Sequence, residues 1–303
     1  MDKKMAVLLI AGAASLWGII GFFVSNLYSL GFTPIQVVAA RAIIAAIFLV
    51  SYAFLRNRKA LKIKPSDSKY FFGTGVISIV LFNWCMFIAI EETSISVSAI
   101  LLYTAPAFVT LFARILFKEI ITIRKLISLV ITFVGCAFVI GVLPTFSETV
   151  SVFGLIVGIG SGFFYALYSI FGKFALEKYD SLTVSVYTFV FAAIAVTPFS
   201  GLWSVLHHFA DIQTWLYIVG LGLLSTMVAF ILYTKGLQHI ESSRASIIAT
   251  IEPVVAALVG FFVFQEKLNL WQYAGIVMVI SAVIIVQETR EHRKSIATND
   301  AAV

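Results

Sequence analysis

Charged residues are scarce in this sequence. Asp, Glu, Lys and Arg make up 12% of its 303 residues, about half of the roughly 25% found in soluble domains. Hydrophobic residues make up 61%, which is more apolar surface than a soluble core can bury, so we expect lipid to surround most of the chain. Because each membrane-spanning helix takes about 20 apolar residues, a chain of this length with many spans has no room for a separate soluble catalytic domain.

Cysteine and metal-binding patterns are also scarce. The two cysteines, Cys85 and Cys136, fall inside apolar runs and predict neither a disulfide framework nor a metal site. The adjacent His207 and His208 have no acidic or thiol companion at a spacing suited to metal binding. The sequence lacks an HExxH motif, paired aspartates in mid-span and a Walker loop. We therefore expect no metal, no cofactor and no enzymatic activity.

Long apolar segments are what the sequence does have. They are continuously apolar rather than alternating, and in lipid only helices or closed barrels satisfy the backbone polar groups. We predict an all-α polytopic membrane protein with ten transmembrane helices. The expected spans are 5–26, 34–55, 70–90, 94–117, 123–142, 152–173, 181–204, 213–234, 243–264 and 270–287.

The positive charges gather on one side of these spans. With the N-terminus in the cytoplasm, all but three of the 21 Lys and Arg residues fall in inner loops or tails. The exceptions are Lys267, in an outer loop, and Arg41 and Arg114, within spans. This positive-inside bias predicts cytoplasmic N and C termini in a multi-pass cell-membrane protein. It also accounts for the formal charge of +6 without a nucleic-acid-binding surface. The outer loops carry acidic residues: Glu91, Glu92, Glu148, Asp211 and Glu266.

The chain also repeats itself. At a constant offset of 147 residues, Pro106 matches Pro253 and Glu119 matches Glu266. We predict a first five-helix repeat over 1–145, a second over 150–288, and a polar cytoplasmic tail over 289–303. Because five spans is an odd number, the second repeat must insert upside down relative to the first, as in many secondary transporters.

Several short patterns carry a resemblance to a known family. They are Trp17–Gly18, Pro34 with Arg41, Pro106 to Glu119 ("P…FKE"), and Glu252 to Glu266 ("EP…FQE"). In this order the sequence resembles the drug/metabolite transporter superfamily, and within it the ten-helix EamA-type transporters. The resemblance implies a carrier of small metabolites or amino acids, often an exporter, that works without ATP hydrolysis.

Glu252 is the leading candidate for the functional site. A charge at the centre of a bilayer costs about 2.5–3.5 kcal/mol on insertion scales, so a carboxylate in mid-span needs a reason. We expect it to bind a substrate amine or to couple transport to protons. The alternative is a structural role, as the partner of Arg41 or as a neutral packed acid. The matching residue of the first repeat is Ala105, which favours the substrate role over a shared scaffold role.

Arg41 is the second candidate, because a guanidinium can hold a carboxylate through two hydrogen bonds. Its alternative role is a structural pair with Glu252 or with helix-end carbonyls. Together the two charges would recognise the two ends of a zwitterion. Further candidate lining residues are aromatic or polar side chains that lie too deep for interfacial anchors, although ordinary packing also explains each one singly: Trp17, Asn83, Tyr103, Thr110, Tyr165 and Tyr168.

Four residues are candidates for hinges or gates. Pro106 and Pro253 each remove one backbone hydrogen bond within a span. Glu119 and Glu266 end the two matching spans, where they either cap helices and form gate contacts or make ordinary surface ion pairs.

We therefore expect a secondary active transporter of a small metabolite, most consistent with export of an amino acid or a related zwitterionic compound, by alternating access around a central cavity. The alternatives are an efflux carrier for multiple drugs or cations and, less favoured, an exchanger of sugar phosphates or nucleotide sugars. An exchanger of sugar phosphates or nucleotide sugars would need more basic residues in the cavity. The expected partners are the substrate, the lipid bilayer and, if transport is coupled, protons; the oligomeric state stays open.

Overall fold

The computed structural model describes residues 1–144 and 150–287. The predicted tail 289–303 and the outer-loop residue Glu148 lie outside the described residues. Over the described ranges the chain is helical without strands, and ten helical segments are long and apolar enough to cross a membrane. The prediction of an all-α protein with ten spans is confirmed.

Five of the ten spans are interrupted and five are continuous. The first consists of α1 (Lys3–Gly18) and α2 (Ile20–Ser29), and the second is α3 (Pro34–Arg56). The other spans of the first half are α4 (Ser68–Phe72), the π-helical η3 (Gly73–Val80) and α5 (Leu81–Glu92); α6 (Ile95–Leu102) and α7 (Ala105–Leu116); and α8 (Ile123–Ile140).

The second half begins with α9 (Val152–Leu176) and α10 (Ser181–Val196), which ends in η4 (Thr197–Phe199). The remaining spans are α11 (Ile212–Gly222), the π-helical η6 (Leu223–Val228) and α12 (Ala229–Leu237); α13 (Ser242–Ala249) and α14 (Ile251–Val263); and α15 (Leu270–Gln287). Short 3-10 helices occupy three connections: η1 (Arg58–Leu61), η2 (Pro65–Asp67) and η5 (Leu202–Ala210).

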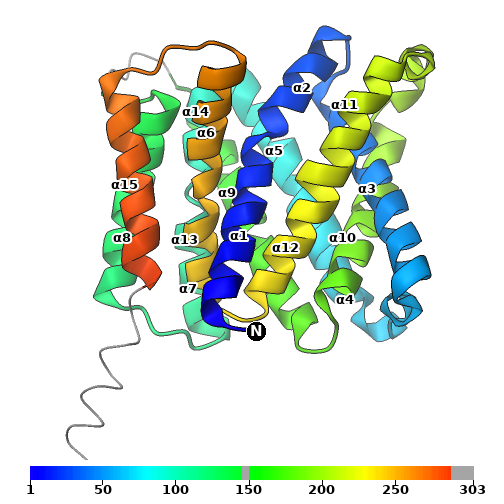
Figure 1. Cartoon of the computed structure of the whole chain (residues 1–303), viewed down its shortest axis with the longest axis horizontal. Coiled ribbons are helices and arrows are strands. Elements are labelled where there is room, and N and C mark those ends of the chain that lie inside the picture. Colours follow the sequence, from blue (N-terminus) through cyan, green and yellow to red (C-terminus); the bar gives the residue numbers. More distant parts are fainter. Residues whose placement is uncertain (145–149, 288–303) are drawn as a thin grey trace, which may run out of the picture.

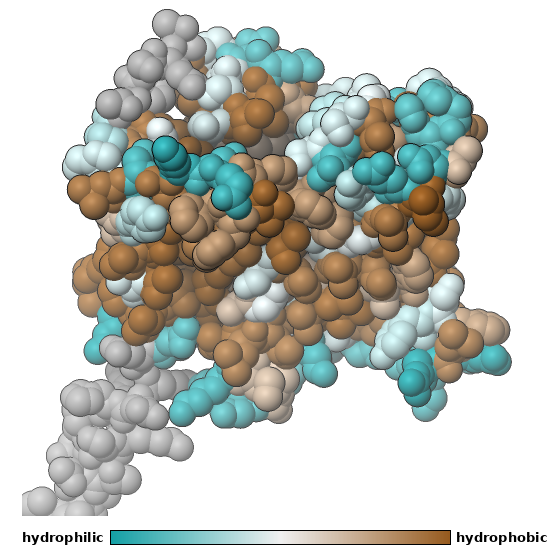
Figure 2. All heavy atoms as spheres, turned by 45° about the horizontal axis from the view of Figure 1, so that its top comes forward, coloured by the Kyte–Doolittle hydropathy of each residue, from teal (hydrophilic) through white to brown (hydrophobic). Residues whose placement is uncertain are grey.

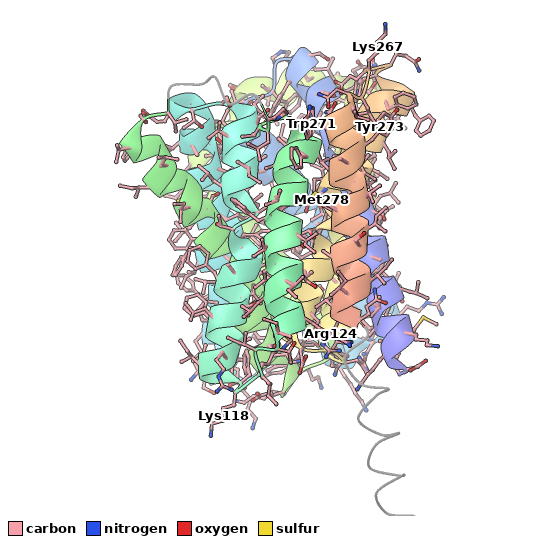
Figure 3. All side chains as sticks on the ribbon, turned by 90° about the vertical axis from the view of Figure 1, so that its left-hand side faces the viewer. Lys118, Arg124, Lys267, Trp271, Tyr273 and Met278 are labelled. Carbon is pink, nitrogen blue, oxygen red and sulfur yellow. The ribbon has the colours of Figure 1, made fainter. Side chains whose placement is uncertain are left out.

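The two ends of the bundle differ in charge. Lys118 and Arg124 lie at the end that also carries the N-terminus, and Lys267 lies at the other end (Figures 1 and 3). We call these ends the basic face and the opposite face. Figure 2 shows a broad apolar belt between more polar groups at the two ends, as expected of a protein whose sides contact lipid.

The offset of 147 residues recurs in the backbone. Among the described residues, Lys118 and Gln265 are the two non-glycine residues with positive φ, at 56° and 57°, an uncommon conformation for such residues. The amides that follow them bond to matching carbonyls: Glu119 N lies 3.1 Å from the carbonyl of Ala113, and Glu266 N lies 3.0 Å from that of Gly260. Figure 1 shows α6 above α7 but α13 below α14, so these matching segments run in opposite directions.

The two halves of the chain are interlocked. α1 packs against α12, α13 and α14 of the second half, and α3 packs against α10. α8 and α15 lie side by side at one end of the long axis (Figure 1). Gly18 is the point of closest approach between α1 and α14, since a Cβ there would lie 2.6 Å from Val255 Cβ and 2.7 Å from the carbonyl oxygen of Glu252.

The crossing at Gly18 gives a first testable prediction. Gly18→Ala forces α1 away from α14, and overpacking of this kind typically costs about 1–3 kcal/mol; we expect a lower thermal unfolding temperature in detergent. Gly21→Ala is the matched control, because a Cβ at Gly21 meets nothing within 4 Å. It lies within α2, where alanine is favoured over glycine by about 1 kcal/mol. Equal losses of stability in both variants would contradict the close crossing.

Candidate functional site

A small central cavity lies where the interrupted helices meet. Its volume of about 20 Å³ suffices for roughly one water molecule and is far too small for a metabolite. It collects residues from α7, α9, α12, α13 and α14 and from the breaks before α7 and α14. The lining residues are Tyr103, Ala105, Pro106, Val109, Tyr165, Ala166, Ser169, Tyr233, Ser246, Ala249, Thr250 and Glu252.

The helix break at Thr250 explains why Glu252 and Pro253 stand together. α13 ends at Ala249 and α14 begins at Ile251, which puts both residues in the first turn of α14. Amide groups of a first turn have no partner within their own helix, so proline is tolerated there. The positive end of the helix dipole favours a carboxylate at the same place. The break thus provides a helix N-terminus at mid-span, and Glu252 lies on it.

The Glu252 side chain is open to the cavity. The residue is partly buried, lines the cavity and makes neither a hydrogen bond nor an ion pair within 4 Å with any described residue. Its carboxylate interacts electrostatically with Arg41, Tyr103 and Tyr165. A buried carboxylate without a hydrogen-bond partner is unusual, and it is available to a ligand.

Arg41 is buried and also lacks a direct partner. The residue is 8% exposed, on the face of α3 that looks into the bundle. It interacts electrostatically with Glu252, Tyr165 and Tyr28, but within the described chain it forms no hydrogen bond and no ion pair shorter than 4 Å. The direct Arg41–Glu252 pair that the sequence allowed is therefore not formed in this structure. The two opposite charges interact electrostatically without direct contact, and Arg41 is not among the residues that line the central cavity.

An aromatic cluster around Trp17 adjoins the cavity. The Trp17 ring centroid lies 5.1 Å from Phe230, 5.1 Å from Tyr233 and 6.5 Å from Tyr165. The indole Nε1 of Trp17 is buried without a hydrogen-bond partner in the described residues. The Tyr165 hydroxyl likewise bonds to no described residue. Trp17, Tyr103, Tyr165 and Glu252, predicted separately, are thus brought together.

Three other predicted lining residues are engaged elsewhere. Asn83 donates to the carbonyl of Ile79 at 2.7 Å, and the Thr110 hydroxyl donates to that of Pro106 at 2.8 Å, each within its own span. The Tyr168 hydroxyl bonds to Thr234 Oγ1 at 2.7 Å, joining α9 to α12. None of the three lines the cavity.

Sequence reasoning missed four polar residues of the cavity wall: Ser169, Tyr233, Ser246 and Thr250. Tyr233 and Ser169 share a hydrogen bond of 2.6 Å between α12 and α9. The argument that selected Tyr165, an aromatic residue too deep for the interface, applies equally to Tyr233. Ser246 and Thr250 carry no such signal, because serine and threonine are common in spans.

At the basic face a carboxylate bridges the two halves of the chain. Glu119, from the loop after α7, accepts hydrogen bonds from Ser242 N at 2.6 Å, Ser243 N at 3.2 Å and Ser243 Oγ at 2.5 Å. It therefore caps the N-terminus of α13. The buried amine of Lys125 lies 3.7 Å from Glu119 and 3.2 Å from Glu241. This group joins the two halves of the chain.

A second polar link joins the halves at the same face. Lys178 donates to Asp67 at 2.7 Å, and this hydrogen bond raises the pKa of the Lys178 amine.

Beside the capped helix lies an open vestibule of about 490 Å³. Its lining residues include Lys3, Lys173, Arg244 and Glu119 itself. Glu119 thus belongs both to the helix cap and to the wall of this vestibule.

Glu266, the match of Glu119, has no such role in this structure. It is exposed at the opposite face and forms no side-chain hydrogen bond or ion pair with any described residue.

Over residues 1–144 and 150–287 no cluster of three or more His, Cys, Asp or Glu side chains is placed to hold a metal ion.

Comparison with known proteins decides the family. The model of the EamA-like transporter family matches residues 4–141 and again residues 152–287. The chain belongs to the EamA-like transporter family. It is therefore a membrane transporter and a multi-pass integral protein of the cell membrane, and the resemblance seen in the sequence is confirmed.

Similar proteins agree with this assignment. An uncharacterized transporter of Archaeoglobus fulgidus is 32% identical over 197 residues, covering 65% of this chain and 68% of the relative. A second one from that organism is 29% identical over 291 residues, covering 95% and 100%. The uncharacterized transporter YxxF of Bacillus subtilis is 24% identical over 299 residues, covering 97% and 93%.

A solved structure shares the fold. It is titled "Crystal structure of protein", and it superposes with a TM-score of 0.76 at 15% identity, covering 94% of this chain and 96% of that one. At this identity the likeness concerns the fold alone.

The tyrosines of α9 give a second prediction. Tyr168→Phe leaves the Thr234 hydroxyl buried without its partner, which typically costs about 1–3 kcal/mol, so we expect a lower unfolding temperature with nearly normal substrate affinity. Tyr165→Phe removes a hydroxyl that bonds to no described residue, so we expect normal stability and weaker transport in vesicles. The reverse pattern would show that Tyr168, not Tyr165, serves the transport site.

Proposed function

We propose that this EamA-like transporter is a secondary carrier of a small zwitterionic metabolite of the amino-acid class, and that it works by alternating access in the direction of export. The observation that carries the proposal is a pair of unlike charges that interact electrostatically, Glu252 in the cavity wall and the buried Arg41. Neither has a hydrogen-bonded partner in the described chain.

The chemistry of this pair suits a zwitterion. A guanidinium binds a carboxylate through two parallel hydrogen bonds, and the Glu252 carboxylate complements a primary ammonium group. Buried charges without partners are costly, and bringing in a matched partner removes that cost. A ligand with one charge of each sign satisfies both residues together, whereas a ligand with a single charge leaves the other unmatched.

The rest of the architecture fits alternating access. The central cavity of about 20 Å³ cannot hold an amino acid, so binding requires the two halves to separate around it. The basic face is sealed by Glu119, which bonds across the halves. We take the basic face as cytoplasmic by the positive-inside rule and the halves as inverted repeats. On this assignment the structure is closed toward the cytoplasm.

Glu252 is also our candidate for proton coupling. As the acid nearest the cavity centre, it can carry either a substrate ammonium or a proton, and such competition couples the two fluxes. Exchange of one substrate molecule for another without a proton uses the same residues. A pH gradient imposed across vesicles separates these two modes.

Efflux of organic cations is the second candidate, favoured by the aromatic surroundings of Glu252. Tyr165 and Tyr233 line the cavity together with Glu252, and Trp17 contacts both rings. Aromatic rings attract quaternary or aromatic cations. In that case Arg41 is structural. Anionic sugar phosphates are disfavoured, because none of the residues that line the cavity is basic.

Glu252→Gln tests the role of the carboxylate. The change keeps size and polarity but removes the charge, and hydrogen bonds to charged groups are worth about 1.5–3 kcal/mol. We expect counterflow of a labelled amino acid in proteoliposomes to fall at least about tenfold, with wild-type insertion and stability. If transport is proton-coupled, the residual flux also loses its response to a pH gradient. Wild-type counterflow in this variant would remove Glu252 from the site.

Arg41→Lys tests the other end of the ligand. Lysine keeps the positive charge but loses the forked geometry, so we expect the apparent affinity for a carboxylate-bearing substrate to fall about tenfold. Uptake of a cation without a carboxylate should stay unchanged. Equal losses for both ligands would assign Arg41 to the scaffold, as the second candidate function requires.

A further inference from the structure

We propose that the carrier switches between its two states by exchanging one helix cap for another. In the state described, the Glu119 carboxylate caps α13 and closes the basic face. In the other state, the Glu266 carboxylate caps α6 and closes the opposite face. The proposal goes beyond the function proposed above, although it rests on the same alternating access.

The first support is the cap that the structure contains. Glu119 lies on the loop between α7 and α8, in the first half of the chain, and its carboxylate accepts two backbone amides and a hydroxyl of α13, in the second half. The first amides of a helix have no intrahelical partners, and a carboxylate there also meets the positive end of the helix dipole. The contact therefore closes the face and satisfies α13 at once.

The second support is that Glu266 is held on the same backbone frame. Lys118 and Gln265, the residues before the two glutamates, share a positive φ, and Glu119 N and Glu266 N share the same type of hydrogen bond six residues back. A non-glycine residue in this conformation is uncommon. Its recurrence at the one matching place shows that the backbone holds both glutamates in the same way, although the Glu266 carboxylate lies over Gly260 of the preceding helix α14.

The third support is the state of the matching helix start. At the same offset of 147 residues, Ser242 and Ser243 correspond to Ile95 and Ser96, at the start of α6. That helix begins with its own Ser94 hydroxyl accepting from Val97 N at 3.2 Å, and no carboxylate among the described residues caps it. Glu266 in turn has no side-chain partner there. A donor group and an acceptor group are thus both available at the opposite face.

The fourth support is the packing around the two places. α7 packs against α13 at the basic face, whereas α14 and α6, the matching pair, have at most marginal contact. In Figure 1, α6 and α14 both extend toward the opposite face, as α7 and α13 extend toward the basic face. The protein is therefore tight where its cap is made and loose where the matching cap is missing.

The exchange gives the transport cycle two closed ends of similar strength. Each state contains one carboxylate cap across the halves and lacks the other, so moving between states replaces one set of charge-assisted hydrogen bonds by an equivalent set. The inner cap has additional charges, since Lys125 lies near Glu119, whereas its counterpart at the opposite face is the uncharged Gln272. This difference favours the state closed at the basic face.

Side-specific labelling of a cavity cysteine tests the proposal without any substrate. The parent carries Cys85→Ala, Cys136→Ala and the reporter Ala249→Cys, in the cavity wall. Membrane vesicles of each orientation receive a membrane-impermeant thiol reagent. The rate from each face then reports how often the cavity opens to that face. Because no transport is measured, a failure of this test is distinguishable from a failure of the proposed function.

We expect the two glutamates to act in opposite directions. Glu119→Gln weakens the inner cap and raises labelling from the basic face about tenfold. Glu266→Gln weakens the other state, in which Glu266 caps α6 and the cavity is open to the basic face. It therefore lowers labelling from the basic face by a similar factor. The double variant returns toward the parent ratio, because each state then loses one cap. The proposed exchange would be overturned if both single variants changed the labelling rate from the basic face in the same direction. It would also be overturned if Glu266→Gln had no effect on that rate.

Two controls keep the result interpretable. Glu91→Gln removes a carboxylate at the same face as Glu266, but its repeat counterpart is Gln238, so we expect an unchanged ratio. If Glu119→Gln fails to fold, Ser243→Ala removes only the hydroxyl donor of the same cap, and the expected shift has the same sign.

A crosslink tests the second cap directly. If the cysteines of Glu266→Cys and Ser96→Cys form a disulfide that blocks labelling from the opposite face, the contact between Glu266 and α6 is supported. If that disulfide does not form although Glu119→Cys and Ser243→Cys do crosslink, the proposed second cap is contradicted.

Discussion

The interior of a membrane cannot solvate a charge, yet this protein holds a guanidinium and a carboxylate at mid-depth without joining them. Arg41 and Glu252 are close enough to interact electrostatically, but within the described chain neither has a direct partner. Two unmatched charges are costly in such surroundings, and that cost is removed when a ligand of complementary charge enters. In the function proposed above, the removal of this cost contributes to the free energy of substrate binding.

Interrupted helices make such a site possible. A continuous helix satisfies all of its interior backbone groups, whereas the breaks before α7 and α14 place free helix ends in the centre of the bundle. Glu252 lies on one of these ends, where the dipole favours its charge. The same device recurs at the basic face, where the start of α13 receives the Glu119 carboxylate. In our proposals, substrate recognition and closure use one physical principle, a carboxylate at a helix N-terminus.

Much of this could be predicted from the sequence, because lipid imposes strong rules on composition. The ten spans follow from apolar runs, and Pro106 and Pro253 mark two of the interruptions, those before α7 and α14. Side-chain partnerships were harder. Asn83 and Thr110 bond within their own spans, and no pattern distinguishes such a polar residue from one that lines a cavity. The Glu119 cap depends on a contact across 123 residues of sequence, and no local signal encodes it.

The central claim, a site built for one charge of each sign, is tested most directly by ligand-induced stabilisation of the purified protein. A ligand that binds the folded state raises the unfolding temperature by mass action. The account predicts a rise with an amino acid, and little or none with the matching amine or the matching carboxylic acid at the same concentration. An amine or quaternary cation that stabilises the protein as strongly as any amino acid would contradict it.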